Sequence, residues 1–203
     1  SSINAFAMLG GVIGVHTGLI LASNSESEVA SVLGHEIAHV TQRHLPRMIA
    51  QQKNDSIKTV LGIALALLVA RANPQLSAGT MTAASAMGVQ KQLDYTREHE
   101  KEADRVGFQI LTDAGFDGRS MVSFFNTLQR GSRFSEGAAP SFLRTHPITT
   151  DRISDISNRV KESRYRQIPD NPDFIFIKSK LRASNGTPQS AVDEFEGSIK
   201  DKR

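Results

Sequence analysis

Residues 35–39 read His35-Glu36-Ile37-Ala38-His39, which places two histidines four positions apart with a carboxylate beside the first. An α-helix turns by about 100° per residue, so the two imidazoles lie about 40° apart on one helical face and can bind the same metal ion. Glu36 lies one position round the helix, where its carboxylate can reach a water on the metal rather than the metal itself. The spacing predicts a catalytic zinc site, and a chance match in an ordinary helix is the alternative at this point.

The stretch around this motif predicts a long, partly buried helix. Ser25 followed by Glu28 forms a capping-box pattern, and apolar residues recur behind it at helical spacing, so we expect a helix from about Glu26 to Gln52. The immediate neighbours of the two histidines are mostly uncharged. Burial of charged histidine and glutamate side chains is unfavourable unless they are paired or bound to a metal, which favours the metal-site interpretation.

A catalytic zinc site of this type needs a third protein ligand. In the metzincin pattern a glycine and a histidine follow the second histidine at the third and sixth positions, but this sequence has Gln42 and Leu45 there. That class is therefore excluded. His44 is out of register with the motif on a continuous helix, and we expect it to be an exposed polar residue beside Arg43.

An acidic run at residues 98–104, inside a helix expected at about residues 90–114, offers the missing ligand. Glu100 and Asp104 share one face of that helix because they are four residues apart. With Glu100 on the metal, Asp104 could accept a hydrogen bond from the free ring N–H of a ligand histidine. A charged run standing alone is more often a solvated face, and its pairing with the histidine helix is what favours a metal site.

The composition of the 203-residue chain indicates a globular protein, with 39% apolar and 22% charged residues. The absence of cysteine excludes disulfide scaffolds, thiolate zinc fingers and cysteine nucleophiles. The net charge is +3 without a run of five like charges, so we expect no nucleic-acid binding. The longest apolar stretch, Val60 to Ala70, falls short of the roughly 20 residues of a membrane span and predicts a buried helix, or one in contact with a membrane surface.

The remaining patterns predict an α+β fold that is mainly helical, with a small β-sheet. Residues 4–21 are rich in glycine and β-branched residues, which favours one or two short strands and a tight turn. Further helices are expected at about residues 57–72, 120–130 and 149–163, with a polar loop at residues 131–140.

The C-terminal part is expected to form a helical hairpin. Asn171-Pro172 and Thr187-Pro188 each place a capping residue before a proline, which is typical of a helix start. We therefore expect one domain at residues 1–163, followed at residues 164–203 by a linker and this hairpin. The sequence opens without a charged and apolar leader, and we expect any targeting peptide to lie outside it.

Five short motifs carry a resemblance to a known family. They are Asn4-Ala5-Phe6-Ala7, Gly18-Leu19, His35 to Val40, Glu100-Lys101-Glu102-Ala103-Asp104 and His146-Pro147. Together they resemble the CAAX-protease/HtpX family of zinc metallopeptidases, and within it the soluble BepA-like branch, in which a peptidase domain precedes tetratricopeptide repeats. The resemblance covers about residues 3–160, and the 65-residue gap from His35 to Glu100 makes it specific.

The resemblance implies a zincin-like (gluzincin) metallopeptidase domain with one zinc ion per chain. Its protein ligands would be His35, His39 and Glu100, and Glu36 would be the general base. It also implies that His146 can occupy the fourth position on the zinc and hold the enzyme latent.

Two further roles come with the resemblance. Arg152 matches a family arginine near the site, where it could steady a developing oxyanion. The N-terminal segment would supply the edge strand on which an extended substrate lies. The residues of that edge strand are Gly11, Val12, Ile13, Gly14 and Val15.

The resemblance also implies a place and a substrate class. It suggests a periplasmic endopeptidase that acts on unfolded or misassembled outer-membrane proteins, with the outer-membrane assembly machinery as a partner and a tail that resembles the start of a tetratricopeptide-repeat array. The alternative is a chaperone or assembly factor in which the zinc site is latent and the repeats dock the assembly partners.

Overall fold

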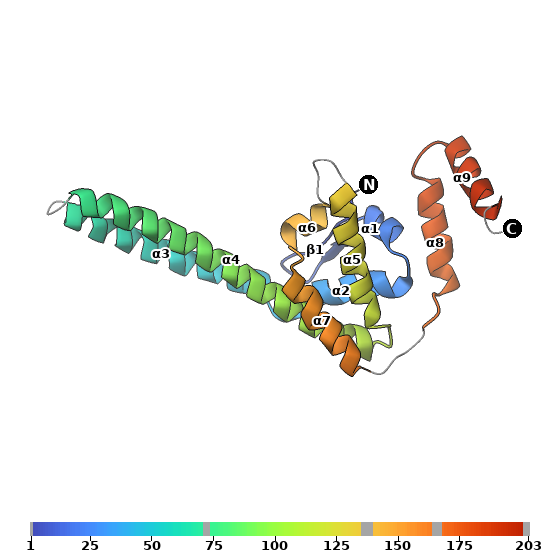
Figure 1. The fold of residues 1–203 in the computed structure, drawn as a ribbon, viewed down its shortest axis with the longest axis horizontal. Coiled ribbons are helices and arrows are strands. Elements are labelled where there is room, and N and C mark those ends of the chain that lie inside the picture. Colours follow the sequence, from blue (N-terminus) through green and yellow to red (C-terminus); the bar gives the residue numbers. More distant parts are fainter. Residues whose placement is uncertain (1, 71–73, 135–139, 164–167, 201–203) are drawn as a thin grey trace.

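The computed structural model describes residues 2–70, 74–134, 140–163 and 168–200, without the side chains of residues 65–70, 74–87, 89, 91 and 132–134. Two short strands and nine helices in these ranges confirm the expected mainly helical α+β fold (Figure 1). The elements are β1 (Ala5–Ala7), β2 (Ile13–Val15), α1 (Thr17–Ala22), α2 (Glu26–Thr41), α3 (His44–Ala70), α4 (Pro74–Asp113), α5 (Arg119–Phe134), α6 (Ser141–Thr145), α7 (Thr150–Glu162), α8 (Pro172–Ala183) and α9 (Pro188–Lys200).

Helix α2 lies in the middle of the body, packed against α4, α5 and the sheet (Figure 1). The hydroxyl of Ser25 accepts a hydrogen bond from the backbone N–H of Glu28 at 3.2 Å, which confirms the predicted helix start. Gly34 of α2 faces Gly107 of α4, and a Cβ atom on Gly107 would lie 2.9 Å from the backbone N and Cα of His35. The two helices therefore approach each other more closely than side chains would allow.

Two apolar clusters hold the body together around α2. One joins the first strand, α1 and α2 to α5 and α6; the other joins the C-terminal part of α4 to α5 and α7. The first consists of Ala5, Leu19, Val32, Phe124, Leu128 and Phe142, and the second of Phe108, Leu111, Met121, Phe125 and Ile156.

The strands β1 and β2 form an antiparallel hairpin in which Ala5 pairs with Val15 and Ala7 with Ile13. Gly10 and Gly11 both adopt a positive φ, of 89° and 82°, in the turn between them. This conformation is accessible to glycine at little cost and explains the glycine-rich sequence. The expected edge strand is therefore shorter than predicted, because Gly11 and Val12 belong to the turn and only residues 13–15 to the strand.

Helices α3 and α4 form an antiparallel arm that projects from the body (Figure 1). The single helix expected from Glu26 to Gln52 is wrong: α2 ends at Thr41, and α3 runs from His44 to Ala70. The break lies at Arg43, which adopts a positive φ of 54°. A non-glycine residue in this left-handed region is uncommon, and here it turns the chain between two helices.

Three other boundaries also differ from the sequence prediction. The helix expected at about residues 90–114 begins at Pro74, so α4 has 40 residues. The helix expected at about residues 57–72 is the outer half of α3 as far as Ala70, and residues 71 and 72 lie outside the described residues. The loop expected at residues 131–140 is wrong for residues 131–134, which belong to α5, and its residues 135–139 lie outside the described part of the chain.

The helices α8 and α9 form a hairpin, and neither contains a buried residue. The hairpin contacts the body mainly through α1, where the Lys178 ammonium donates a hydrogen bond to the Ser23 carbonyl. At its base, Asp170 accepts a hydrogen bond from the Glu26 N–H at 2.7 Å, and the Glu26 carboxylate accepts one from the Asn171 N–H at 3.0 Å. The start of the tail is thus attached to the N-terminus of α2.

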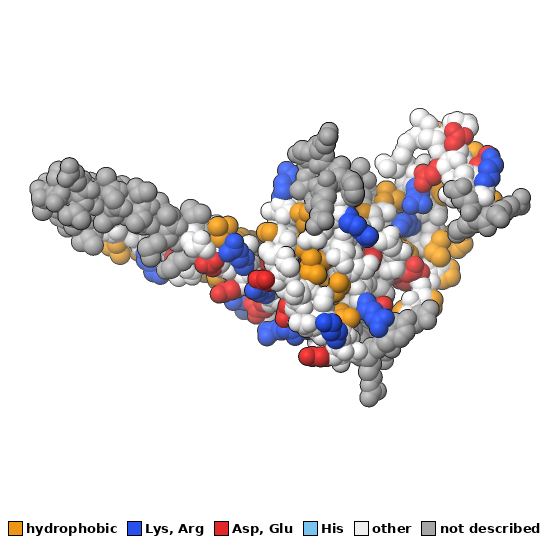
Figure 2. Space-filling view, viewed as in Figure 1, with side chains coloured by type: hydrophobic (Ala, Val, Ile, Leu, Met, Phe, Trp, Pro, Cys, Tyr) orange, Lys and Arg blue, Asp and Glu red, His pale blue; other side chains and the backbone are white. Residues whose placement is uncertain are grey.

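Among the described residues, no helix has the length and hydropathy of a membrane span. The apolar stretch expected to be buried or interfacial lies on the arm, where Val60 is 66% and Leu61 64% exposed. Figure 2 shows described apolar side chains at the surface of the arm in orange. The side chains of residues 65–70 of this stretch lie outside the described part of the structure.

Candidate metal centre

Four side chains from three elements converge where α2 crosses α4. His35 and His39 come from α2, Glu100 from α4, and His146 from the residue that ends α6. The Nε2 atom of His35 lies 3.0 Å from Nε2 of His39, 3.3 Å from Oε2 of Glu100 and 3.3 Å from Nδ1 of His146. Glu100 Oε1 lies 3.3 Å from His39 Nε2 and 3.0 Å from His146 Nδ1. One ligand atom of each residue thus lies within 4.8 Å of every other.

These spacings fit a tetrahedral zinc ion. Ligands bound at about 2.0–2.1 Å to a tetrahedral ion lie about 3.3 Å from one another, and five ligand pairs of the cluster lie at 3.0–3.3 Å. Imidazole nitrogens and a carboxylate are also the donors that zinc prefers when no thiolate is present.

The charge balance of the site also fits a divalent cation. The side chains of Glu36, Glu100 and Asp104 are all buried, and the one buried guanidinium beside them in the described structure is that of Arg152. With the carboxylates ionised and the histidines neutral, the forms that bind a metal, three carboxylates against one guanidinium leave two negative charges in excess. Uncompensated buried charge is unfavourable, so a dication among these residues would remove the imbalance.

Asp104 and Arg152 lie directly behind the cluster. Asp104 Oδ1 is 3.0 Å from Nδ1 of His35, the ring nitrogen opposite the one that faces Glu100. Arg152 donates to both Asp104 oxygens at 2.6 and 2.7 Å, to the Pro147 carbonyl at 2.7 Å, and its Nη1 lies 2.9 Å from Glu100 Oε2. The guanidinium therefore ties the carboxylates of α4 to the backbone beside His146.

Burial and hydrogen bonding act in opposite directions on the pKa values of the cluster. Burial lowers the pKa of His35, but Asp104 and Glu100 outweigh it and raise this pKa to about 9. Burial lowers the pKa of His39 to about 4. Burial would raise the pKa of Glu100, but hydrogen bonds with His146, His35 and His39 hold it well below its usual value. Glu100 is therefore ionised and His39 neutral at neutral pH, the forms in which each can bind a metal.

Glu36 points to the same space from the next position on α2. Its Oε1 atom is buried, has no hydrogen-bond partner in the described structure, and lies 3.4 Å from Nε2 of His146. His146 therefore lies between Glu36 and Glu100. Its ring stacks on Phe142 at 4.5 Å, and the Phe142 N–H donates to the Ile3 carbonyl at 3.1 Å, so α6 is held against the segment that leads into β1.

The turn of the β-hairpin lies beside the same end of α2. A Cβ atom on Gly11 would be 3.7 Å from Val40, the residue after His39. The sheet consists of β1 and β2 alone in the described part of the chain. The hairpin is thus close to the histidine helix, and the use of β2 as a substrate edge stays a prediction.

Comparison with known proteins gives the family of a chain with this site. The sequence profile of Peptidase family M48 matches residues 1–160. The chain belongs to peptidase family M48. The prediction of a zinc metallopeptidase domain is confirmed at this level, and the cluster of His35, His39 and Glu100 fits the two histidines and the glutamate of its metal-binding pattern.

Individual relatives of this M48 domain are longer proteins. A Vibrio cholerae protein assigned as a beta-barrel assembly-enhancing protease is 40% identical over 201 residues, which are 98% of this chain and 41% of that protein. The beta-barrel assembly-enhancing protease of Escherichia coli strain K12 is 35% identical over 207 residues, 99% of this chain and 42% of the relative. The mitochondrial metalloendopeptidase OMA1 of Arabidopsis thaliana is 32% identical over 145 residues, 71% of this chain and 27% of OMA1. The chain thus spans about two fifths of the length of the first two.

The structure corrects the interpretation of His44. The sequence predicted an exposed polar residue, but His44 is 3% exposed and packs behind His39 in the M48 domain. The prediction failed because it assumed a continuous helix, on which residues 39 and 44 lie about 140° apart. The turn at Arg43 removes that constraint.

The close contact between Gly34 and Gly107 was also missed. It determines how near α2 can come to α4, and so how near His35 can come to Glu100. A glycine directly before the motif and another two helical turns after Glu100 were the available sequence features. Neither indicates a partner by itself.

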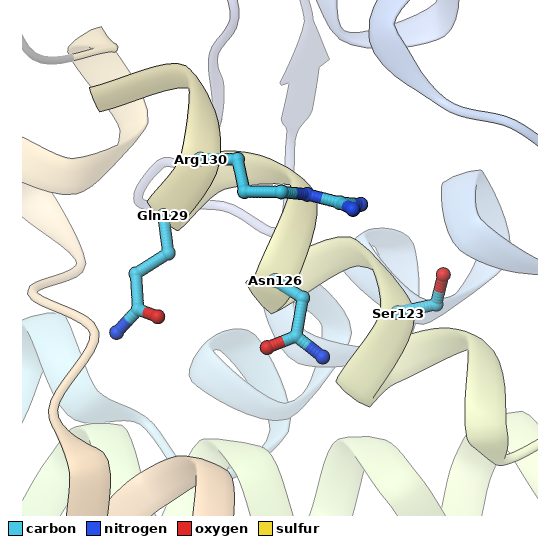
Figure 3. Close-up of a pocket in the computed structure, with 4 residues that line it drawn as sticks. All are labelled: Ser123, Asn126, Gln129 and Arg130. Carbon is cyan, nitrogen blue, oxygen red and sulfur yellow. The ribbon is translucent and has the colours of Figure 1, made fainter. Parts of the chain in front are cut away.

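A separate hollow on α5 does not belong to the metal centre of the M48 domain. It is lined by Ser123, Asn126, Gln129 and Arg130, which lie on successive turns of the helix (Figure 3). The Ser123 hydroxyl is engaged with Glu28 Oε1 at 2.6 Å. The described lining holds no group of metal ligands.

Proposed function

We propose that this chain is the catalytic domain of a zinc-dependent endopeptidase that hydrolyses peptide bonds of unfolded or misassembled polypeptides. The observation that carries the proposal is the convergence of His35, His39 and Glu100 with the buried carboxylate of Glu36 beside them. These three ligands would hold one zinc ion per chain.

The chain's own groups then have distinct tasks. A zinc ion held there supplies the Lewis acidity that acidifies a water and polarises the scissile carbonyl. Glu36 accepts the proton of the attacking water and passes it to the leaving amine. Asp104, whose Oδ1 lies 3.0 Å from Nδ1 of His35, would fix that ring by accepting the Nδ1 proton. Arg152 holds the carboxylates of α4 in this resting geometry, and an oxyanion role would require one of its N–H groups to leave the Pro147 carbonyl or Glu100.

We further propose that His146 keeps the site latent. Its Nδ1 atom lies 3.3 Å from His35 Nε2 and 3.0 Å from Glu100 Oε1, and its Nε2 atom faces Glu36 at 3.4 Å. A fourth protein ligand would occupy the position that a substrate carbonyl or water needs, and the ring would also block the general base. Activity then depends on the fraction of molecules in which His146 has moved away.

The names of the relatives suggest the substrates. Beta-barrel assembly-enhancing proteases match nearly the whole chain, so we propose misassembled outer-membrane proteins as substrates, the outer-membrane assembly machinery as a partner, and the periplasm as the location. An extended substrate would pair with the free edge of β2. Residues 1–163 would form the peptidase domain and residues 164–203 the linker and the start of a repeat array. The apolar stretch Val60 to Ala70 of the arm, which is exposed at Val60, Leu61 and Ile63, would contact the membrane surface.

A chaperone or assembly factor with a latent zinc site is the second candidate. It is favoured by the four-residue cluster, which has no ligand position left for a substrate when His146 is in place. The exposed apolar residues of α8, such as Phe176 at 72%, would then serve to dock a partner.

The two candidates can be separated by measuring zinc content and hydrolysis of an unfolded polypeptide such as casein at matched zinc occupancy. Glu36→Gln should retain zinc and lose at least ~10²-fold in turnover. His146→Ala should hydrolyse faster than the parent protein. Because His146 keeps the parent slow, the refuting result is sought without it: equally fast hydrolysis by His146→Ala and by the double variant His146→Ala/Glu36→Gln would refute the peptidase mechanism. If no zinc-loaded variant cleaves, but the protein still suppresses aggregation of an unfolded outer-membrane β-barrel protein, the chaperone candidate is correct.

A further inference from the structure

A chain of hydrogen-bonding side chains runs from the outer nitrogen of His39 to the surface of the arm. His44 and His99 are 3% and 5% exposed, and their rings stack at 4.3 Å with 10° between the planes. His44 Nδ1 lies 2.9 Å from Nδ1 of His39, and its Nε2 lies 3.1 Å from Oε2 of Glu102. Arg47 donates to the same Glu102 oxygen at 2.9 Å. None of these contacts has a role in the proposed reaction.

The direction of these hydrogen bonds follows from which atom of each pair carries the proton. Two imidazole Nδ1 atoms at 2.9 Å share one proton, so one ring donates and the other accepts. An ionised Glu102 can only accept, which places the proton of a neutral His44 on Nε2 and leaves Nδ1 as an acceptor. His39 must then be the donor, with its proton on Nδ1. Its Nε2 atom, which faces His35 and Glu100, is left with a free lone pair.

The opposite direction would disable the ligand. If His44 donated from Nδ1, a neutral His39 would carry its proton on Nε2, and that nitrogen could not bind a metal. The hydrogen bonds from His39 through His44 to Glu102 therefore select the tautomer of His39 that a metal centre requires.

His35, the other ligand histidine, faces a carboxylate without a residue between them. His35 Nδ1 lies 3.0 Å from Asp104, which is itself held by Arg152. His39 reaches its carboxylate, Glu102, only through His44. Each ligand histidine is thus connected to a carboxylate of α4 that also binds an arginine.

The local fold holds His44 in this position. The positive φ at Arg43 ends one helix and starts the next, so His44 is the first residue of α3 rather than part of α2. Its ring lies flat on His99, which directly precedes the ligand Glu100 on α4. Tyr95, one turn before His99 on α4, packs against the ring of His99, with 4.0 Å between the ring centroids. The hydrogen-bonded side chains therefore come from both helices of the arm, at its base, where α3 begins and α4 returns to the body.

We propose that His44 is a positioning residue for the metal centre: it accepts the Nδ1 proton of His39 and, through Glu102, holds His39 Nε2 ready as a ligand. The inference rests on the proposed zinc site but assigns a new role outside its ligands. Residues of this kind alter metal affinity by about 10- to 100-fold when they are removed.

The test measures zinc affinity of the purified chain by competition with a chromophoric chelator. His44→Phe retains a flat ring to stack on His99 but removes the acceptor, and should weaken zinc binding about 10- to 100-fold. His44→Asn returns an acceptor oxygen near the lost Nδ1 and should recover most of that loss. Glu102→Ala should weaken binding, whereas Glu98→Ala, which removes an exposed carboxylate from the same helix, should not.

Two comparisons with the parent protein distinguish a failure of this inference from a failure of the proposed function. If the parent binds zinc no better than His35→Ala, the proposed zinc site is wrong and this inference falls with it. If the parent binds zinc but His44→Phe binds within twofold of it, or His44→Asn binds no better than His44→Phe, only the role of His44 is overturned. Thermal unfolding of the zinc-free proteins reports any purely structural effect.

A second measurement covers the case in which His44 variants do not fold. Long-range ¹H–¹⁵N NMR spectra of the parent distinguish the two neutral tautomers of a histidine. The proposal expects the proton of His39 on Nδ1 and that of His44 on Nε2. A proton on Nδ1 of His44 would overturn it.

Discussion

The contact between Gly34 and Gly107 offers a direct test of how the metal centre is assembled. In Gly107→Ala the new methyl group would lie 2.9 Å from two backbone atoms of His35 and 3.0 Å from the carbonyl carbon of Gly34. These are backbone atoms, which cannot avoid the methyl group by changing rotamer. The helices α2 and α4 must therefore move apart by several tenths of an ångström.

The magnitude follows from comparison with Gly62→Ala, which places the same methyl group in open space on α3. Both variants gain the helix propensity of alanine, about 1 kcal/mol, so the difference between them isolates the clash. Overpacking typically costs about 1–3 kcal/mol, and we expect Gly107→Ala to be less stable than Gly62→Ala by that amount. Since Glu100 lies on the displaced helix, zinc affinity should fall as well.

Urea unfolding of the zinc-free proteins measures the stability difference, and chelator competition measures zinc affinity. Each kcal/mol corresponds to about 2–4 °C in the melting temperature of a chain of this size. Equal stability of Gly107→Ala and Gly62→Ala would show that the glycine contact does not limit the approach of α2 to α4, and would refute the reasoning.

Two further predictions concern the charges behind the ligands. The pKa of His35 in the metal-free fold is about 9 against 6.5 for the unfolded chain, so folding takes up a proton there and the free energy of unfolding should fall as the pH rises from 6.5 to 9; a flat or rising urea-unfolding profile in chelator would contradict this. Arg152→Ala removes the guanidinium that binds both carboxylate oxygens of Asp104, which is 1% exposed, and should lower the free energy of unfolding by about 3–5 kcal/mol, whereas Arg159→Ala at a more exposed pair should cost less than about 1 kcal/mol. A loss of similar size in both variants would contradict the second prediction.

The residues that could be predicted from sequence are those whose chemistry lies in local spacing. The histidines of the motif are four residues apart on one helix, so their shared face follows from helical geometry alone. Glu100 and Asp104 share a face for the same reason. The structure brings all four together, as the metal-site prediction required.

The residues that were missed depend on the backbone between elements. The position of His44 is decided by a left-handed conformation at Arg43. Arginine in a sequence does not indicate such a turn, because non-glycine residues rarely adopt this conformation. The length of the arm depends on α4 continuing back to Pro74, well before the start expected at about residue 90. The pairing of Gly34 with Gly107 is a long-range contact, and a single sequence carries no record of it.

The arm has a consequence for how this domain can vary. The chain leaves the body at His44 and returns at His99, and the stacked rings of these two residues place its ends side by side. The arm therefore begins and ends at the same place on the body. Removing seven residues from each helix, about two turns or roughly 10 Å of length, would preserve the helical phase of both ends. The distance the domain can reach is therefore a variable that can be lengthened or shortened without redesigning the chemistry at its base.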